Sequence, residues 1–456
     1  MSEGFFKSSG AVARFFEMEE RQTSFSTELI AGLTTFVTMS YVIFVQPAVL
    51  AAAGMDFGAV MAATCISAAF GSILMGLYSN LPIAQAPGMG QNFFFAFTLC
   101  GSAAMGGYGM TWEQALGAVF LSGVIFLAIS LAGIRGYFFR LMPDTMKFAI
   151  GAGIGLLIAL IGLEWGGVVV ASPGTLVKLG SLSHGPALMV MAVVALMGAL
   201  TVLRVRGAIL IGIAFSTVWA LIAGYAGWHG VISSPPSLTP TFLKLDVAGA
   251  LNAPFIIIAV FTFVFLDMFD GIGTITAVSH EAGLLKGGYI PKAHQGLISD
   301  ASAGIAGSFL GTSTVTSYIE SSTGVAAGGR TGLSAVVVGL LFLLALFIHP
   351  LAQMVGGGYE AAKGQMLYPV IAPALILVGS FMAPLGANIE WHKPEEGIPA
   401  FLTMAMMPFA FSIAEGLSIG FITYSLLHTG IGGAPKTHPA IHFLAVCFAL
   451  RYLFLS

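Results

Sequence analysis

The sequence contains very few charged residues. Asp, Glu, Lys and Arg together make up 8% of its 456 positions, whereas hydrophobic residues make up 57%. Soluble globular chains carry about 25% charged residues, so this composition indicates a chain that lies mostly in a lipid bilayer. The apolar runs recur along the whole length, which argues against a soluble domain with one membrane anchor. The formal net charge is only −3. This balance argues against a nucleic-acid partner, which would require a basic surface.

Cysteine is also scarce. The three cysteines, Cys65, Cys100 and Cys447, lie inside apolar runs, which indicates packing residues rather than a disulfide framework or a zinc site. No pair of histidines has the spacing of metal ligands, so we expect neither a metal nor another cofactor. Residues 1–26 are polar and mixed in charge. They lack the apolar core of a cleavable signal peptide, so the first apolar run is expected to be a retained span.

What the sequence does contain is a series of apolar segments along its whole length. A straight membrane span needs about 20 residues. Fourteen segments reach or approach that length, at 27–47, 58–78, 83–100, 113–132, 144–162, 186–203, 207–225, 252–279, 294–309, 311–327, 331–349, 366–383, 398–427 and 437–455. The sequence therefore predicts an all-α polytopic membrane protein with 14 transmembrane segments.

The distribution of lysine and arginine predicts the orientation, because cytoplasmic loops are enriched in both residues. With the N-terminus in the cytoplasm, only four of the 17 lysines and arginines fall on the outer side, namely Lys178, Lys244, Lys363 and Lys436. We therefore expect a multi-pass protein of the cell membrane whose residues 1–26 form a cytoplasmic segment.

The two halves of the chain share landmarks in the same order. Residues 27–228 and 250–456 each hold seven apolar segments, and a broken segment lies at 83–100 in the first half and at 311–327 in the second. Because seven is odd, the second half must enter the membrane from the opposite face. This pattern predicts a 7+7 inverted repeat, the architecture of many secondary transporters.

The two broken segments contain residues that membrane helices normally avoid. They read NLPIAQAPGMGQNFFFAF and GTSTVTSYIESSTGVAAGGRTG, and each is expected to form a short extended stretch followed by a half-helix. Irregular backbone at membrane depth is tolerated only where protein covers it or a cavity wets it, and paired breaks of this kind mark a transporter's binding site. We therefore expect Pro87 and its neighbouring glycines to break the helix so that Asn92 faces a ligand. A simple proline kink is the alternative.

Several acidic residues lie inside apolar segments. Asp267 and Asp270 are three residues apart and share one helical face, and Glu320 ends the extended part of the second broken segment. A carboxylate near the bilayer centre costs at least about 2.5–3.5 kcal/mol, which favours a functional role. The structural alternatives are a helix cap for Glu320 and a backbone pairing for Asp270. For Glu415 we expect a break between two short helices around Glu415-Gly416.

These groups indicate the class of ligand. A side-chain amide, carboxylates and aromatic rings such as Phe94 and Tyr318 suit a flat heterocycle with several N–H donors. Burial favours the neutral form of a carboxyl group, so the same acids can bind and release a proton during transport. The residues alone thus predict a proton-linked carrier of a small polar ring, with the proton as coupling ion.

At these residues the sequence resembles the AzgA-like purine permeases, a branch of the nucleobase–cation symporter (xanthine–uracil permease) superfamily. The resemblance covers essentially the whole chain, through ELIAGLTTFVTMSYVIFVQPAVL, APGMGQNFFFAF, DMFDGIGT, GTSTVTSYIESSTGVAAGGRTGL and MPFAFSIAEGLSIGF. It implies proton-coupled uptake of the purine nucleobases adenine, guanine or hypoxanthine, by a homodimer. It also implies a mobile core domain (spans 1–4 and 8–11) beside a gate domain (spans 5–7 and 12–14).

The resemblance also implies roles for individual residues. The positions that matter for recognition and transport in the family match Asn92, Asp267, Asp270 and Glu320. We hypothesise that Asp267 and Glu320 bind the purine edge and that Asn92 adds a hydrogen bond. Asp270 would support the second broken segment or the proton route.

The chain departs from the family pattern at three positions. Family members read Met-Gly-Leu-Asn-Ala where this chain has Gln91 and Phe93, and they commonly have Thr where Gly271 stands. A phenylalanine that points inward would reshape the pocket, so the preferred purine stays open. Two rival functions also stay open. An anion carrier of the same fold predicts a cationic residue near the breaks, and an intramembrane enzyme would use Asp267 and Asp270 as a carboxylate pair.

Overall fold

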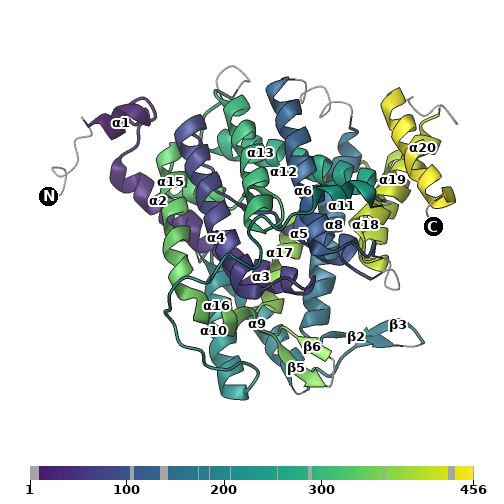
Figure 1. Ribbon diagram of the computed structural model, residues 1–456, viewed down its shortest axis with the longest axis horizontal. Helices are drawn as coiled ribbons and strands as arrows, with labels where there is room; N and C mark the ends of the chain where they lie inside the picture. The colour runs from purple at the N-terminus through teal and green to yellow at the C-terminus, as the bar shows by residue number, and fades with distance from the viewer. Residues whose placement is uncertain are drawn as a thin grey trace.

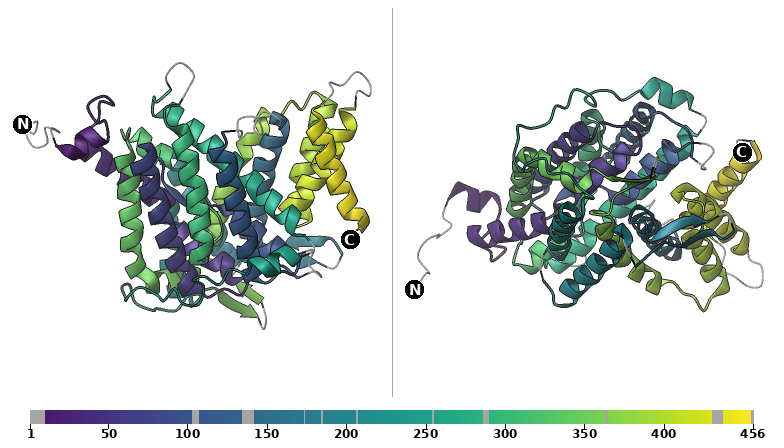
Figure 2. Two further views of the ribbon diagram at one scale, coloured as in Figure 1. Left: turned by 45° about the horizontal axis from the view of Figure 1, so that its top comes forward. Right: turned by 90° about the horizontal axis from the view of Figure 1, so that it is seen from below.

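The computed structural model describes residues 10–102, 107–133, 142–172, 174–183, 185–205, 207–253, 255–285, 290–362, 365–429 and 437–454. Seven of the lysines and arginines used to predict the orientation lie outside these residues, namely Lys7, Arg135, Arg140, Arg206, Lys286, Lys363 and Lys436. The described chain is mostly helical, and most of its helices run roughly side by side (Figures 1 and 2).

Six helical stretches of the described chain are long and apolar enough to cross a membrane. They are Phe25–Ala51, Phe57–Ser79, Trp112–Leu131, Asp144–Trp165, Ile256–Glu281 and Gly332–Gly356. Shorter apolar helices occupy Pro186–Val202, Ala208–Ala223, Ala372–Asn388, Ile413–Leu427 and Pro439–Leu450. The chain is therefore a multi-pass membrane protein.

The first half of the chain forms the following elements: α1 (Ala11–Phe15), α2 (Phe25–Met39), α3 (Val42–Ala51), α4 (Phe57–Leu74), β1 (Gln85–Pro87), α5 (Met89–Phe93), α6 (Trp112–Leu131), α8 (Asp144–Trp165), β2 (Val169–Ser172), β3 (Leu176–Leu179), α9 (Pro186–Val202) and α10 (Ala208–Ala223). Local signals set several of the helix starts. The side chains of Ser24, Asp56 and Thr111 accept hydrogen bonds from backbone N–H groups in the first turns of α2, α4 and α6, as N-cap residues do.

The second half forms α11 (Val247–Asn252), α12 (Ile256–Glu281), α13 (Ala293–Leu310), β4 (Val315–Ser317), α14 (Ser321–Ala326), α15 (Gly332–Ala345), α16 (His349–Gly356), β5 (Tyr359–Ala362), β6 (Gln365–Leu367), α17 (Ala372–Met382), α18 (Pro394–Phe409), α19 (Ile413–Leu427) and α20 (Pro439–Phe454). The hairpins β2–β3 and β5–β6 were not expected from the sequence. Both hairpins lie at the face of the molecule opposite α1 (Figure 1).

The predicted extended stretches in the two broken segments are confirmed. β1 and β4 pair antiparallel, with Gln85 opposite Ser317 and Pro87 opposite Val315. The short half-helix α5 follows β1, and α14 follows β4. Pairing between the two strands satisfies backbone groups that would otherwise be left unpaired inside the helix bundle, which is the condition for non-helical chain at membrane depth.

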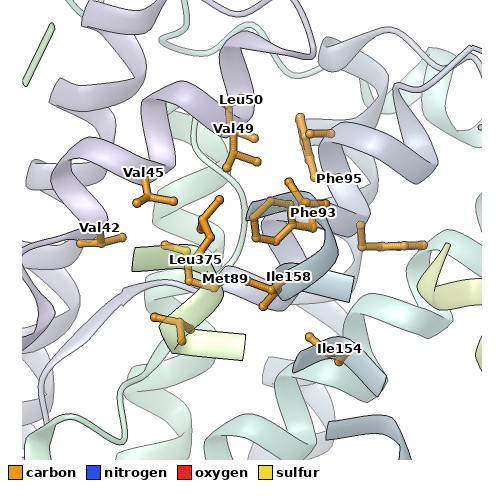
Figure 3. Packing of buried hydrophobic residues seen from close by; sticks show 14 of the residues in the cluster. Val42, Val45, Val49, Leu50, Met89, Phe93, Phe95, Ile154, Ile158 and Leu375 are labelled. Atoms are coloured by element: carbon orange, nitrogen blue, oxygen red, sulfur yellow. The ribbon is translucent and has the colours of Figure 1, made fainter. Parts of the chain in front are cut away.

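The helices pack into two groups. The first group consists of α2, α3, α4, α6, α12, α13 and α15, with β1 and β4 among them, and the second consists of α8, α9, α10, α17, α18 and α19. An apolar cluster joins the groups. In it, Met89 and Phe93 of the half-helix α5 lie near Ile158 of α8 and Leu375 of α17 (Figure 3).

The stretch 398–427 does not form the single span that the sequence predicted. It contains two helices, α18 and α19, which pack against each other. The chain turns at Phe411, which has a positive φ of 51°, and Ser412 then caps α19. The expected break at Glu415-Gly416 is therefore wrong by a few residues. Gly416 instead allows close packing, since a Cβ there would lie 2.8 Å from the backbone oxygen of Thr403.

The N-terminal segment is tied to the first helix group by polar contacts. Arg21 donates hydrogen bonds to the backbone oxygens of Asn80 (2.7 Å) and Arg330 (3.0 Å). Glu17 forms ion pairs with Arg21 (2.9 Å) and Lys292 (3.2 Å). Burial alone would raise the pKa of Glu17, but the hydrogen bonds and charges of Arg21 and Lys292 hold its pKa below the ordinary value. The segment before the first span is thus fixed across the ends of several helices.

Candidate functional site

A cavity of about 490 Å³ lies between the two helix groups. The first group contributes α2, both broken segments and α12, and the second contributes α17 and the connection between α9 and α10. Its polar walls include Tyr41, Asp270, Tyr318 and Glu320. The volume falls within the range of small-molecule sites, about 300–1,000 Å³. Of the five residues expected at the ligand, Tyr318 and Glu320 therefore line this cavity, and so does Asp270, which was expected in a supporting or proton-carrying role.

Glu320 is held from the first span of the chain. The hydroxyl of Tyr41, in the short gap between α2 and α3, donates a hydrogen bond to Oε1 of Glu320 at 2.9 Å. Glu320 itself is half-buried at the start of α14, and its side chain does not cap that helix. Tyr41 was not anticipated, and the only signal in the sequence is its polar neighbour Ser40 within an apolar run.

The two aspartates of α12 occupy different environments. Asp270 is exposed and lines the cavity, whereas Asp267 is buried and accepts a hydrogen bond from Thr314 of the second broken segment at 2.9 Å. The amide of Gln91 donates to both acids, at 3.4 Å to Asp267 and 3.2 Å to Asp270. Asp267 is thus an acid bonded to the second broken segment, a supporting contact that the hypothesis from the sequence had considered for Asp270.

Asn92 and Phe94 lie behind the cavity wall. Asn92 is fully buried, and its side-chain oxygen accepts a hydrogen bond from Ser313 of the second broken segment. Phe94 is also fully buried and meets Phe263 of α12 edge to face, with ring centroids 5.0 Å apart. Neither residue is among those that line the cavity. Both contribute to the packing of the first broken segment against its neighbours.

The aromatic residue Tyr318 joins the two broken segments directly. It lines the cavity, and its hydroxyl donates a hydrogen bond to the backbone oxygen of Pro87 at 2.5 Å. Its own backbone N–H donates to the oxygen of Ala84. Tyr318 thus presents part of its ring to the cavity while it fixes β4 against β1.

A further acid near the broken segments, the buried Asp300 of α13, was not anticipated from the sequence. Asp300 accepts hydrogen bonds from Gln85 of β1 and Ser317 of β4, each at 2.9 Å, and from Thr316 at 3.4 Å. A carboxyl group of α13 therefore supports the paired strands β1 and β4. The signal was available, since Asp300 lies within the predicted apolar segment 294–309.

The structure also accounts for two of the departures from the family pattern. Phe93 is buried in the apolar cluster, stacks on Phe97 with centroids 6.0 Å apart, and does not line the cavity. Gly271 leaves room for Asp300, because a Cβ at that position would collide with the Asp300 carboxylate. Neither substitution changes the shape of the cavity directly.

The acids of the site have no cationic partner among the described residues. Within the described residues, no lysine or arginine forms an ion pair with Asp267, Asp270 or Glu320. Arg204 also borders the cavity, from the connection between α9 and α10 on the opposite wall. The acids and the adjacent backbone can accept hydrogen bonds from a ligand with N–H groups.

The contact between Thr314 and Asp267 gives a first testable prediction. Thr314→Val leaves one oxygen of a buried acid without its donor, which costs about 1–3 kcal/mol. The midpoint of thermal unfolding in detergent should therefore fall. Thr64→Val is the matched control, since the buried Thr64 hydroxyl has no hydrogen-bond partner among the described residues. Equal midpoints for both variants would contradict a supporting role for Thr314.

Comparison with known proteins places the chain in a family. Residues 26–360 match the model of the Xan_ur_permease family, which is described as a permease family. The guanine/hypoxanthine permease PbuG of Bacillus subtilis (strain 168) is 44% identical over 97% of this chain and 99% of its own length. The adenine permease AdeP of Escherichia coli (strain K12) is 41% identical over 98% of this chain and 97% of its own length.

A solved structure shares the fold at low sequence identity. The transmembrane domain of the cyanobacterial bicarbonate transporter BicA aligns with a TM-score of 0.62 over 86% of this chain and 96% of that domain, at 17% identity. Such a likeness bears on the fold alone. The family match covers most of the chain, and the two relatives match it over nearly their whole length. The chain is therefore a membrane transporter rather than an enzyme, and it belongs to this permease family.

Proposed function

We propose that this permease imports the purine nucleobases adenine, guanine or hypoxanthine across the cell membrane together with protons. The observation that carries the proposal is the presence of two acids, Asp270 and Glu320, in one cavity where the two broken segments meet. Relatives more than 40% identical to this chain are named as adenine and guanine/hypoxanthine permeases, which supports purines as the ligand class.

The chemistry of the cavity suits a neutral ring with N–H donors. Each cavity acid already has one oxygen held by a protein donor, Glu320 by Tyr41 and Asp270 by Gln91. The remaining acceptor capacity faces the ligand, and Tyr318 offers an aromatic surface. Asp267 and Asn92 act in this proposal by holding the two broken segments together, so Asp270 takes the ligand-binding role that the sequence had assigned to Asp267.

Proton coupling follows from the same acids. A carboxyl group at membrane depth is costly as an unpaired anion, so protonation of Asp270 or Glu320 lowers the cost of moving the loaded site past the second helix group. Release of the proton on the cytoplasmic side would then return the acid to its charged form for the next cycle. This coupling requires no bound metal or other cofactor.

We infer an inverted repeat of seven segments in each half from the way the elements pack. Contacts between helices occur in corresponding pairs. The contact of α4 with α15 corresponds to that of α13 with α6, and the contact of α8 with α18 corresponds to that of α17 with α9. β1 of the first half and β4 of the second half are counterparts, and they pair antiparallel with each other. In this scheme α19 is the counterpart of α10, and α20 is an additional helix outside the repeat.

The repeat supports transport by alternating access. The first helix group corresponds to the core domain that the family resemblance implies, and the second group corresponds to the gate domain. The cavity lies between them, so a movement of one group against the other would expose it to each side in turn. We retain a cytoplasmic N-terminus and a homodimer as parts of the proposal. In this orientation both hairpins, β2–β3 and β5–β6, face the outside.

Purified protein in proteoliposomes tests the proposal. With an inward proton gradient, labelled hypoxanthine should accumulate, and a protonophore should abolish accumulation while substrate exchange continues. Excess adenine or guanine should compete. Accumulation that is indifferent to the protonophore would contradict proton coupling, and the absence of any purine uptake or exchange would contradict the substrate class.

An anion carrier is the second candidate, because one cationic residue, Arg204, borders the cavity. The two acids on the other wall disfavour a bound anion, because like charges repel at short range. Labelled bicarbonate in the same proteoliposomes separates the candidates, since the purine carrier should neither transport it nor be inhibited by it.

A further inference from the structure

The side chain of Gln91 holds one oxygen of Asp270, and its position is unusual. It belongs to the half-helix α5, is 2% exposed, and does not line the cavity. Its Nε2 lies 3.4 Å from Oδ1 of Asp267 and 3.2 Å from Oδ2 of Asp270. A side-chain amide carries two N–H donors, so one amide group serves two acids that stand one helical turn apart.

The neighbouring glycine makes this arrangement possible. A Cβ at Gly88 would collide with the amide oxygen of Gln91 and would lie 2.8 Å from its Cδ. The φ of Gly88 is −71°, which any residue can adopt, so the backbone conformation does not require glycine here. The space that Gly88 leaves is occupied by the Gln91 amide.

The amide connects the interior with the cavity. Thr314 donates to one oxygen of Asp267, Gln91 donates to the other, and the same Gln91 amide reaches Asp270 in the cavity wall. Oδ2 of Asp270 is thereby occupied, whereas Oδ1 accepts no hydrogen bond from the described residues. Asp270 therefore offers a ligand one free oxygen rather than two.

We propose that Gln91 is a specificity-determining positioning residue, which occupies one oxygen of Asp270 and so limits that acid to a single N–H of the substrate. The inference rests on the proposed purine transport. A carboxylate with both oxygens free accepts two parallel N–H bonds, and guanine presents such a pair, N1–H beside its 2-amino group. Hypoxanthine lacks the 2-amino group. Gln91 thus reduces the advantage that guanine would otherwise have over hypoxanthine.

The test replaces the amide without changing its volume much. Gln91→Met removes both N–H donors and frees the second oxygen of Asp270. The ratio of inhibition constants of hypoxanthine and guanine, measured against labelled adenine, should shift toward guanine by about tenfold or more, as expected for a hydrogen bond to a charged group. Gln353→Met is the control, because Gln353 is an exposed amide on α16, and its ratio should equal that of the unmodified protein.

A second variant distinguishes an effect on specificity from an effect on folding. Gly88→Ala keeps the Gln91 amide in the chain but displaces it from Asp270, so it should shift the same ratio in the same direction. A role of Gln91 in folding alone would lower the amount of transporter without altering the ratio. An unchanged ratio in both variants, or a shift toward hypoxanthine, would overturn the inference while purine transport stands. Failure of the unmodified protein to transport any purine would instead overturn the proposed function.

Discussion

Replacing Glu320 with glutamine is expected to abolish concentrative purine uptake while the protein still folds. In the unmodified protein the hydroxyl of Tyr41 lies 2.9 Å from Oε1 of Glu320. Glutamine has nearly the same volume as glutamate, and its side-chain oxygen can still accept this hydrogen bond. The variant loses the negative charge and the ability to carry a proton. Removal of a carboxylate near the bilayer centre also removes a cost of burial, so stability should not fall.

The size of the effect follows from the two functions that Glu320 combines. Loss of a hydrogen bond to a charged acceptor alone weakens binding by about tenfold or more. Loss of the proton carrier adds to this, because the residual transport can no longer be driven by the gradient. Uptake of labelled hypoxanthine, normalised to the amount of transporter in the membrane, should therefore fall to the level of cells that lack the protein.

Two further variants make this prediction specific. Glu390→Gln changes an exposed acid that pairs with Lys393 at 2.8 Å, and its uptake should be normal. Tyr41→Phe removes only the donor to Glu320, so its uptake should lie between those of Glu320→Gln and the unmodified protein. Normal accumulation by Glu320→Gln would remove this acid from the mechanism.

The features that the sequence predicted well are those with local chemical signals. Pro87 and its adjacent glycines predict a break within an apolar run, and the Ser/Thr-rich stretch before Glu320 predicts another. Both breaks are present as β1 and β4 with their following half-helices. Acidic residues inside apolar segments are equally easy to recognise in the sequence, because placing a carboxylate in a membrane costs more free energy than placing most other side chains there.

The pairing of distant residues could not be predicted in the same way. Gln85 and Asp300 are 215 positions apart, and Tyr41 and Glu320 are 279 apart. Nothing in the local sequence of either member of these pairs specifies its partner. The spacing of Asp267 and Asp270 predicts a shared helical face, but the rotation of α12 against its neighbours decides which acid faces the cavity. The spacing alone therefore could not assign a separate role to each aspartate.

The close contact between α8 and α17 leads to the prediction with the largest expected effect on stability. A Cβ at Gly155 of α8 would lie 2.8 Å from the backbone oxygen of Gly379 in α17 and 2.6 Å from Cβ of Met382. A Cβ at Gly379 would in turn collide with the backbone oxygen of Gly155. Each helix thus uses a glycine to approach the other, as expected for two helices related by a twofold axis. Small residues at such crossings are what allow membrane helices to pack closely.

Gly155→Ala should therefore destabilise the second helix group, although alanine is the better helix former. Neighbouring backbone cannot move aside as a flexible side chain would, and overpacking of this kind costs about 1–3 kcal/mol. Gly198→Ala in α9 is the matched control, because a Cβ there meets nothing within 4 Å, and alanine favours a helix by up to about 1 kcal/mol over glycine. In thermal unfolding in detergent, the first variant should unfold at a lower temperature than the original chain and the second should not. Equal midpoints would show that α8 and α17 can separate freely, which would contradict a second helix group that moves as one unit.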